Sequence, residues 1–172
     1  MTDVTLKEGS FNYKFTDVDW VNKLDDWNFH KKNFQSVAGG SRAVDFIAVK
    51  GHTCWLIECK DYRLDASPMI EEIALTFAKK FRDSLALLQA AKLNSKDDDE
   101  KIYSAAALKC SEFRFVAHIE PYDPKKNPKL QKPNLANLKI KIEQKTRGVV
   151  NKLLICETGS SIGIIEPSKI GH

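Results

Sequence analysis

Two neighbouring apolar segments of the sequence carry charged residues whose types and spacing could do chemistry. Asp45 lies in the segment 43–49. Glu58 and Lys60 lie in the segment 53–60 after a short turn, and alternation along a strand directs both to one face. A charged group inside an apolar strand costs free energy unless it is paired or binds a cation. These residues therefore need either a metal ion or an ion pair.

A metal ion would give all three groups a role. Two carboxylates from adjacent strands offer the hard oxygen ligands that suit Mg²⁺ or Mn²⁺. Such an ion polarises a phosphate and lowers the pKa of bound water, and a nearby lysine could orient or deprotonate that water or stabilise the developing charge. A structural ion pair between the acids and Lys60 near a sheet edge is the open alternative.

The four cysteines of the chain lack CxxC spacing and are expected to be reduced thiols. Zinc ligation by His52, Cys54 and Cys59 is disfavoured, because strand alternation points the two cysteines to opposite faces. A cysteine enzyme is a third option. It would need one thiol beside a histidine, for which the candidates are His30, His52 and His118.

The elements that must position Asp45, Glu58 and Lys60 are a strand hairpin and the helix after it. The segments 43–49 and 53–60 have the branched, aromatic and apolar content of strands. The helical spacing of apolar residues then predicts a long amphipathic helix that ends near residue 93, with Ser67-Pro68 at its start.

The rest of the chain alternates between predicted helices and strands. We expect helices at 17–27, 101–109 and 134–146, and strands at 33–38, 112–119, 151–157 and 161–165. The acidic run 96–100 lacks the spacing of a calcium-binding loop and is expected to be a solvated link. This order predicts an α/β fold, a central mixed β-sheet flanked by helices.

Length and composition favour a single soluble domain over residues 1–172. No apolar run approaches the roughly 18 residues of a membrane span, and the first residues lack the pattern of a signal peptide, so we expect a cytoplasmic protein.

The net charge of +4 is unevenly distributed along the chain. Residues 125–172 hold ten Lys and Arg against three acids, whereas residues 1–124 hold seventeen against twenty. The basic part could face phosphates or form a solvated surface. Its clustered residues are Lys125, Lys126, Lys129, Lys132, Lys139, Lys141, Lys145, Arg147 and Lys152.

At the two acids and the lysine, the sequence resembles the PD-(D/E)xK phosphodiesterase superfamily, the restriction-endonuclease-like nucleases. Members carry an acid on one strand and, across a short hairpin, an acid-x-Lys on the next strand, followed by a helix. Val44-Asp45 matches the first motif with Val in place of the usual Pro, and Glu58-Cys59-Lys60 matches the second. The predicted element order over residues 17–119 is similar to the αβββαβ core of that family.

The resemblance implies a Mg²⁺-dependent endonuclease that hydrolyses phosphodiester bonds of DNA, with Mn²⁺ as a substitute ion. It implies that Asp45 and Glu58 bind the metal, helped by the backbone carbonyl of Cys59, and that Lys60 serves the attacking water. Many members add an acid from the first helix. Glu8, which precedes the predicted helix, is the candidate assigned to the metal site, and the other acids of this region are Asp17, Asp19, Asp25 and Asp26. A surface position is the open alternative for each of them.

Nucleic acid is the partner that the resemblance implies. The residues expected to contact it are Tyr62, Arg63, Lys125, Lys126, Lys129 and Lys132. For Tyr62 and Arg63, a local packing role is the open alternative. No base-reading motif is evident, which favours recognition of the backbone or of shape. One such site cuts one strand at a time, so cutting both strands needs a homodimer or two successive events. The same fold without catalysis, as a nucleic-acid-binding or protein-interaction subunit, is the alternative.

Overall fold

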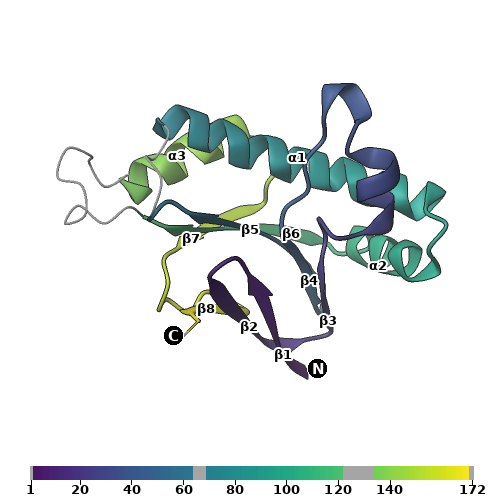
Figure 1. The fold of residues 1–172 in the computed structure, drawn as a ribbon, viewed down its shortest axis with the longest axis horizontal. Helices are drawn as coiled ribbons and strands as arrows, with labels where there is room; N and C mark the ends of the chain where they lie inside the picture. Colours follow the sequence, from purple (N-terminus) through teal and green to yellow (C-terminus); the bar gives the residue numbers. More distant parts are fainter. Residues whose placement is uncertain (1, 64–68, 122–133, 171–172) are drawn as a thin grey trace.

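The computed structural model describes residues 2–63, 69–121 and 134–170, and its central element is a five-stranded sheet (Figure 1). The sheet order is β3-β4-β5-β6-β7. The antiparallel part consists of β3 (Trp20–Lys23), β4 (Phe46–Lys50) and β5 (Thr53–Asp61). The parallel part adds β6 (Glu112–Glu120) and β7 (Lys152–Cys156). The predicted mixed sheet is thereby confirmed, and so is the hairpin of β4 and β5.

Helices cover one face of this sheet (Figure 1). They are α1 (Ile70–Asn94), α2 (Asp98–Leu108) and α3 (Leu135–Lys145). Aromatic contacts join the layers, and the ring centroids of Phe81 in α1 and Phe115 in β6 are 4.3 Å apart. Within the described ranges, no helix combines the length and low polarity that a membrane span requires.

A second, three-stranded sheet covers the opposite face (Figure 1). Its order is β1-β2-β8, formed by β1 (Thr2–Glu8), β2 (Phe11–Val18) and β8 (Ile165–Lys169). Tyr13 and Phe15 of β2 are fully buried and pack on Phe46 of β4, with centroid distances of 5.1 and 5.4 Å. The molecule therefore has three layers: helices, the main sheet and the second sheet.

The predicted helix at 17–27 is wrong, because part of this segment forms β3 at the edge of the main sheet. Val18, Val21 and Leu24 have helical spacing, yet Trp20 to Lys23 pairs in antiparallel register with β4. Hydrogen bonding to a neighbouring strand outweighs a weak local pattern. The αβββαβ order therefore lacks its first helix, and strands β1 and β2 precede the three-stranded meander instead.

Two other predicted strands differ from the structure. The segment 33–38 is not a strand: a π-helical turn at His30–Phe34 and a 3₁₀ turn at Val37–Gly39 lie there. The last strand is β8, which begins where the predicted strand at 161–165 ends. It pairs with β2, a long-range partner that local sequence cannot indicate.

The helix starts are fixed by side chains that accept backbone hydrogen bonds. The Met69 amide donates to Glu72 Oε2 at 3.2 Å at the start of α1, whereas the predicted Ser67-Pro68 lies outside the described residues. Asp97 caps α2 by accepting from the amides of Asp99 and Glu100. The acidic run, expected to be a solvated link, therefore starts this helix, where its charges complement the helix dipole.

Candidate active site

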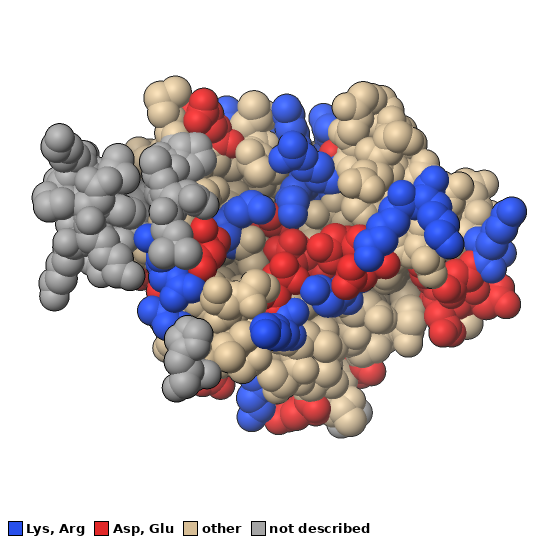
Figure 2. Space-filling model, in the orientation of Figure 1, with Lys and Arg blue, Asp and Glu red and all other residues tan. Residues whose placement is uncertain are grey.

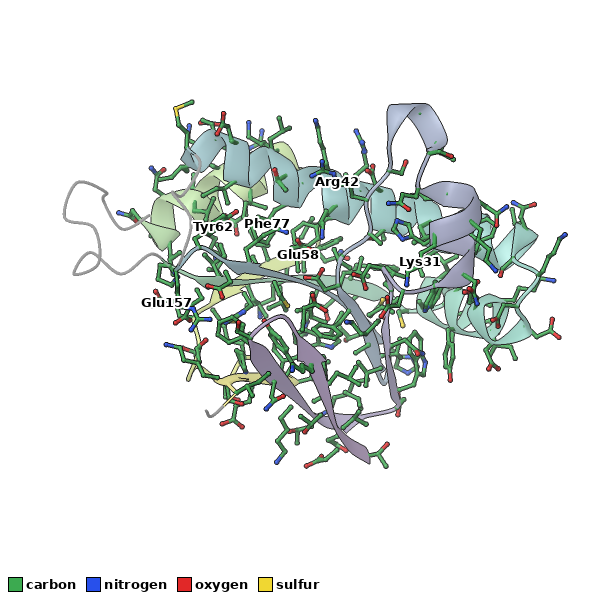
Figure 3. The ribbon with its side chains drawn as sticks, in the orientation of Figure 1. Lys31, Arg42, Glu58, Tyr62, Phe77 and Glu157 are labelled. Atoms are coloured by element: carbon green, nitrogen blue, oxygen red, sulfur yellow. The ribbon has the colours of Figure 1, made fainter. Side chains whose placement is uncertain are left out.

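The β4–β5 hairpin brings Asp45 and Glu58 together on the helix side of the main sheet. Asp45 directly precedes β4, and the Cys59 amide donates to its Oδ2 at 2.6 Å. Glu58 lies in β5 with its side chain fully buried between helix α1 and the sheet (Figure 3). Its neighbours Trp55 and Ile57 pack toward the second sheet. The alternation expected for this strand is therefore observed.

Lys80 of α1 contacts both carboxylates. The sequence had instead favoured a solvated helix face for Lys79, Lys80 and Arg82, with contact to phosphates as the alternative. The Nζ atom of Lys80 lies 2.7 Å from Glu58 Oε2 and 3.4 Å from Asp45 Oδ1, and its side chain is 12% exposed. Lys80 follows the buried Phe77 by three residues and precedes the buried Ser84 by four. This helical spacing places Lys80 on the inner face of α1, a signal that could have identified it.

Lys60 binds the second oxygen of the same carboxylate. Its Nζ lies 2.9 Å from Glu58 Oε1. Burial opposes protonation, but the adjacent Glu58 outweighs it, and the pKa of Lys60 is raised above its ordinary value. Asp45, Glu58 and Lys60 thus lie together, and Lys60 carries a positive charge at neutral pH.

The buried carboxylate of Glu58 remains short of positive charge despite its two lysines. Burial, followed by repulsion from Asp45, raises the pKa of Glu58 to about 7, against the opposing effect of Lys80 and Lys60. An additional cation would favour the ionised form of this carboxylate. A metal ion bound beside Glu58 would therefore lower the pKa of this carboxyl group.

Among the N-terminal acids considered for the metal site, Asp25 is the one whose buried carboxyl group is affected by the charge of Asp45. Its Oδ1 is buried and has no hydrogen-bond partner among the described residues. The Leu24 amide donates to the Asp45 carbonyl at 3.0 Å, which sets Asp25 beside the start of β4. Burial, then the charge of Asp45, raises the pKa of Asp25 to about 6.

The other N-terminal acids have partners of their own. Glu8 and Asp26 both pair with Lys23, at 2.6 and 3.6 Å. Asp17 and Asp19 contact the end of β4 and the turn that follows it, far along the hairpin from Asp45. Glu8, the acid favoured from the sequence, thus forms an ion pair with Lys23, and Asp25 is the N-terminal candidate with a buried carboxylate oxygen that has no hydrogen-bond partner among the described residues.

The donors around Lys80 fit a hard divalent cation. Asp45 Oδ1 and Glu58 Oε2 face one position, which the Lys80 ammonium takes. No three or more His, Cys, Asp or Glu side chains within the described parts of the chain are grouped to hold a metal. Mg²⁺, however, commonly keeps several waters and uses only one or two carboxylates. Two acids are therefore sufficient, provided that the Lys80 ammonium moves aside.

The cysteines do not offer an activated nucleophile. Burial raises the pKa of the Cys54 and Cys59 thiols well above the usual value and that of Cys156 to about 12. The nearby His118 is bound through Nδ1 to the Tyr13 hydroxyl at 2.7 Å. A thiol in such an environment stays protonated, which argues against cysteine-based catalysis.

Tyr62 and Arg63, expected to contact nucleic acid, lie just beyond β5. The Arg63 guanidinium binds Asp61 at 2.7 Å and lies 4.7 Å from the centre of the Phe11 ring. Tyr62 is half-buried, its amide donates to the Glu120 carbonyl, and burial raises its pKa to about 12. The Arg63 side chain thus has internal partners and the Tyr62 ring packs against the hydrophobic core, and their contact with nucleic acid stays a prediction.

The basic C-terminal cluster contributes less free charge than the sequence suggested. Lys141 and Lys145 of α3 both pair with Glu71 of α1, at 2.7 and 3.1 Å. Lys139 pairs with Glu143 within α3. Lys141 and Lys145, which the sequence offered as part of a possible phosphate-facing surface, thus form ion pairs that join α3 to α1. The residues Lys125, Lys126, Lys129 and Lys132 lie outside the described residues.

The sequence is similar to part of a known protein. A cysteine–tRNA ligase of Neisseria meningitidis is 32% identical over 181 aligned residues, which cover 86% of this chain and 26% of the relative. The chain therefore spans about a quarter of the length of this relative. No family profile and no solved structure matches the sequence.

Proposed function

We propose that this protein is a Mg²⁺-dependent nuclease that hydrolyses phosphodiester bonds, with DNA as the expected substrate. Asp45 and Glu58 would hold the metal, for which Mn²⁺ can substitute, together with the carbonyl of Cys59. The observation that carries the proposal is the convergence of both carboxylates on one position, 2.7 and 3.4 Å from a single ammonium nitrogen. Lys60 lies beside that position, bound to Glu58.

The metal, when bound, would polarise the phosphate and lower the pKa of a bound water. The side chains of this protein supply the positioning. The Cys59 amide fixes the direction of the Asp45 carboxylate, and Lys60 holds a positive charge beside Glu58. In this role Lys60 orients the attacking water and stabilises negative charge as the bond to the leaving oxygen breaks. Burial of Glu58 strengthens these interactions, because little water screens them.

A second candidate function is binding without catalysis, as a nucleic-acid-binding or protein-interaction subunit. The contact of Lys80 with both acids favours this candidate, because an ammonium already compensates them. A centre of this kind would be an ion-pair network that holds α1 on the sheet. Binding that weakens steeply with salt, without metal-dependent cleavage, would identify a nucleic-acid-binding subunit.

The relative adds a question about the substrate. Its name links cysteine with tRNA, but this chain spans only a quarter of it, so we do not propose aminoacylation for this protein. The similarity does support tRNA as a substrate to compare with DNA.

The direct test is a cleavage assay on plasmid DNA, single-stranded DNA and tRNA, with Mg²⁺ or with EDTA. We expect EDTA to abolish cleavage, and Asp45→Asn and Lys60→Met each to slow it by at least about 100-fold. Lys92→Met is the control, because Lys92 is exposed near the far end of α1. Equal cleavage by all four proteins would contradict the proposal, and binding without cleavage by the wild type would favour the second candidate.

A further inference from the structure

A hollow of about 510 Å³ lies between helix α1 and the loop that leads to Asp45. This volume is within the usual range for ligand pockets and can admit part of a nucleotide. The polar and charged residues that line it are Arg42, Glu72, Thr76, Lys79, Arg82 and Asp83.

The basic side chains of this hollow are more available than its acids. Arg42, Lys79 and Arg82 are exposed, and neither Arg42 nor Lys79 forms an ion pair in the described part of the chain. Asp83 is buried and binds both the Arg82 guanidinium, at 2.7 Å, and the Arg42 amide, at 3.2 Å. Glu72 caps the start of α1. The hollow therefore offers positive charge to a ligand, and its two acids already have partners.

Two hydrogen bonds join helix α1 to the loop that leads to Asp45. The Arg42 amide donates to Asp83, and the Val44 amide donates to Ser84 Oγ at 2.9 Å. Arg42 precedes Asp45 by three residues, so their Cα atoms are at most about 11 Å apart. Lys79 directly precedes Lys80 in α1. The backbone positions that carry Arg42 and Lys79 are thus close to those of Asp45 and Lys80.

The loop leaves its backbone open to a ligand. Gly39 and Gly40 have φ values of +81° and +122°, which favour glycine, and a Cβ at either position would meet no atom within 4 Å.

On the face seen in Figure 2, acidic side chains gather near the middle, with Lys and Arg side chains around them. Figure 3 places Arg42 on the α1 side of the sheet, as it does Glu58.

We propose that Arg42, Lys79 and Arg82 bind the phosphodiester backbone of one nucleic-acid strand next to the bond that is cleaved. Guanidinium and ammonium groups supply the charge that phosphates require, and the acids at the centre would repel the strand except where a metal neutralises them. The position of this surface relative to the cleaved bond rests on the proposed nuclease function. The binding itself does not require cleavage.

The test compares Arg42→Gln/Lys79→Gln with the control Lys92→Gln/Lys109→Gln, which removes the same charge from exposed positions elsewhere. Fluorescence anisotropy measures binding to single-stranded DNA and RNA of one sequence, in EDTA and over a range of salt concentrations. For at least one of the two strands, the first variant should raise Kd by about tenfold and reduce the slope of log K against log salt by about 1.4, two phosphate contacts at roughly 0.7 each. The control should bind as the wild type does.

Unchanged binding by Arg42→Gln/Lys79→Gln, an equal loss in the control, or no binding by the wild type would each overturn the proposed surface. If the wild type cleaves nucleic acid and the first variant binds normally, the nuclease proposal stands without this surface. If the wild type binds through this surface and never cleaves, the surface stands and the nuclease proposal fails. Lys79→Gln alone, a change at an exposed helix position, should show half the change in slope and replaces the double variant if that variant does not fold.

Discussion

The Nζ atom of Lys80 lies 2.7 Å from Oε2 of Glu58 and bridges this buried carboxylate to Asp45. Burial disfavours the ionised form of a carboxyl group unless a cation lies beside it, and Lys80 and Lys60 both lie beside Glu58. A metal bound between the same two oxygens would compete with the ammonium for one position. Lys80 is therefore expected to stabilise the metal-free protein and to weaken metal binding.

Replacing Lys80 with Met should separate these two effects. Unfolding in urea should show a loss of about 3 kcal/mol without metal, because Glu58 keeps only Lys60 as a partner. Calorimetry should show Mn²⁺ binding tighter by about tenfold, and Mn²⁺ at 100 times Kd should restore about 2.7 kcal/mol of stability. Lys92→Met, at an exposed position of the same helix, should change neither quantity. Weaker Mn²⁺ binding by Lys80→Met would show that Lys80 does not compete with the metal.

Asp25→Asn should make the protein more stable and, if Asp25 supports the metal, less active. A carboxyl group whose pKa is about 6 in the folded protein and 3.8 in the unfolded chain reduces stability as pH rises between these values. Allowing for partial exposure, the variant should gain about 1 kcal/mol at pH 8 and nothing below pH 4. Urea unfolding at both pH values measures this gain. A loss of stability at pH 8 would show that the ionised carboxyl has a favourable partner.

His118 should make the protein less stable in mild acid. Burial lowers its pKa from 6.5 to about 4, so below pH 6.5 the unfolded chain binds a proton that the folded protein does not. The stability lost between pH 6.5 and 4 should be about 3 kcal/mol for this group. Denaturation of His118→Asn across that range should show a smaller loss, and His52→Asn, at an exposed position, should match the wild type. The same pH dependence in all three proteins would contradict this interpretation.

Gly163 should be essential for packing the segment before β8 against the main sheet. A Cβ at this position would overlap the Trp55 ring, and φ is +61°. Gly163→Ala should therefore lower the free energy of unfolding by about 3 kcal/mol, measured by urea denaturation. Gly159→Ala is the control, because φ is +84° but no atom lies within 4 Å of an added Cβ, and it should lose only about 1 kcal/mol. Equal losses would show that only backbone strain matters.

The central part of the fold could be predicted because its pattern is local and strong. The β4–β5 hairpin combines branched apolar residues with a tight turn, and α1 has a long apolar stripe. Strand alternation alone predicted that Glu58 and Lys60 lie on the face opposite Trp55 and Ile57, although it did not indicate which face the helices cover.

The missed elements depend on contacts between distant parts of the chain. Strand β3 has residues with helical spacing but pairs with β4, and β8 pairs with β2 across most of the sequence. Lys80 was missed for a related reason: its charge indicated a solvated position, whereas its partners Asp45 and Glu58 lie on other elements. Such contacts become visible only when the fold brings these elements together.

The most direct test of the proposed metal centre is a calorimetric titration of the protein with Mn²⁺. We expect the wild type to bind Mn²⁺ at a site that Asp45→Asn and Glu58→Gln each weaken by at least about 100-fold, because each removes a charged ligand. Circular dichroism of the variants would establish that both are folded. Absence of Mn²⁺ binding by the wild type, or equal binding by the folded variants, would contradict the metal centre and leave an ion-pair network.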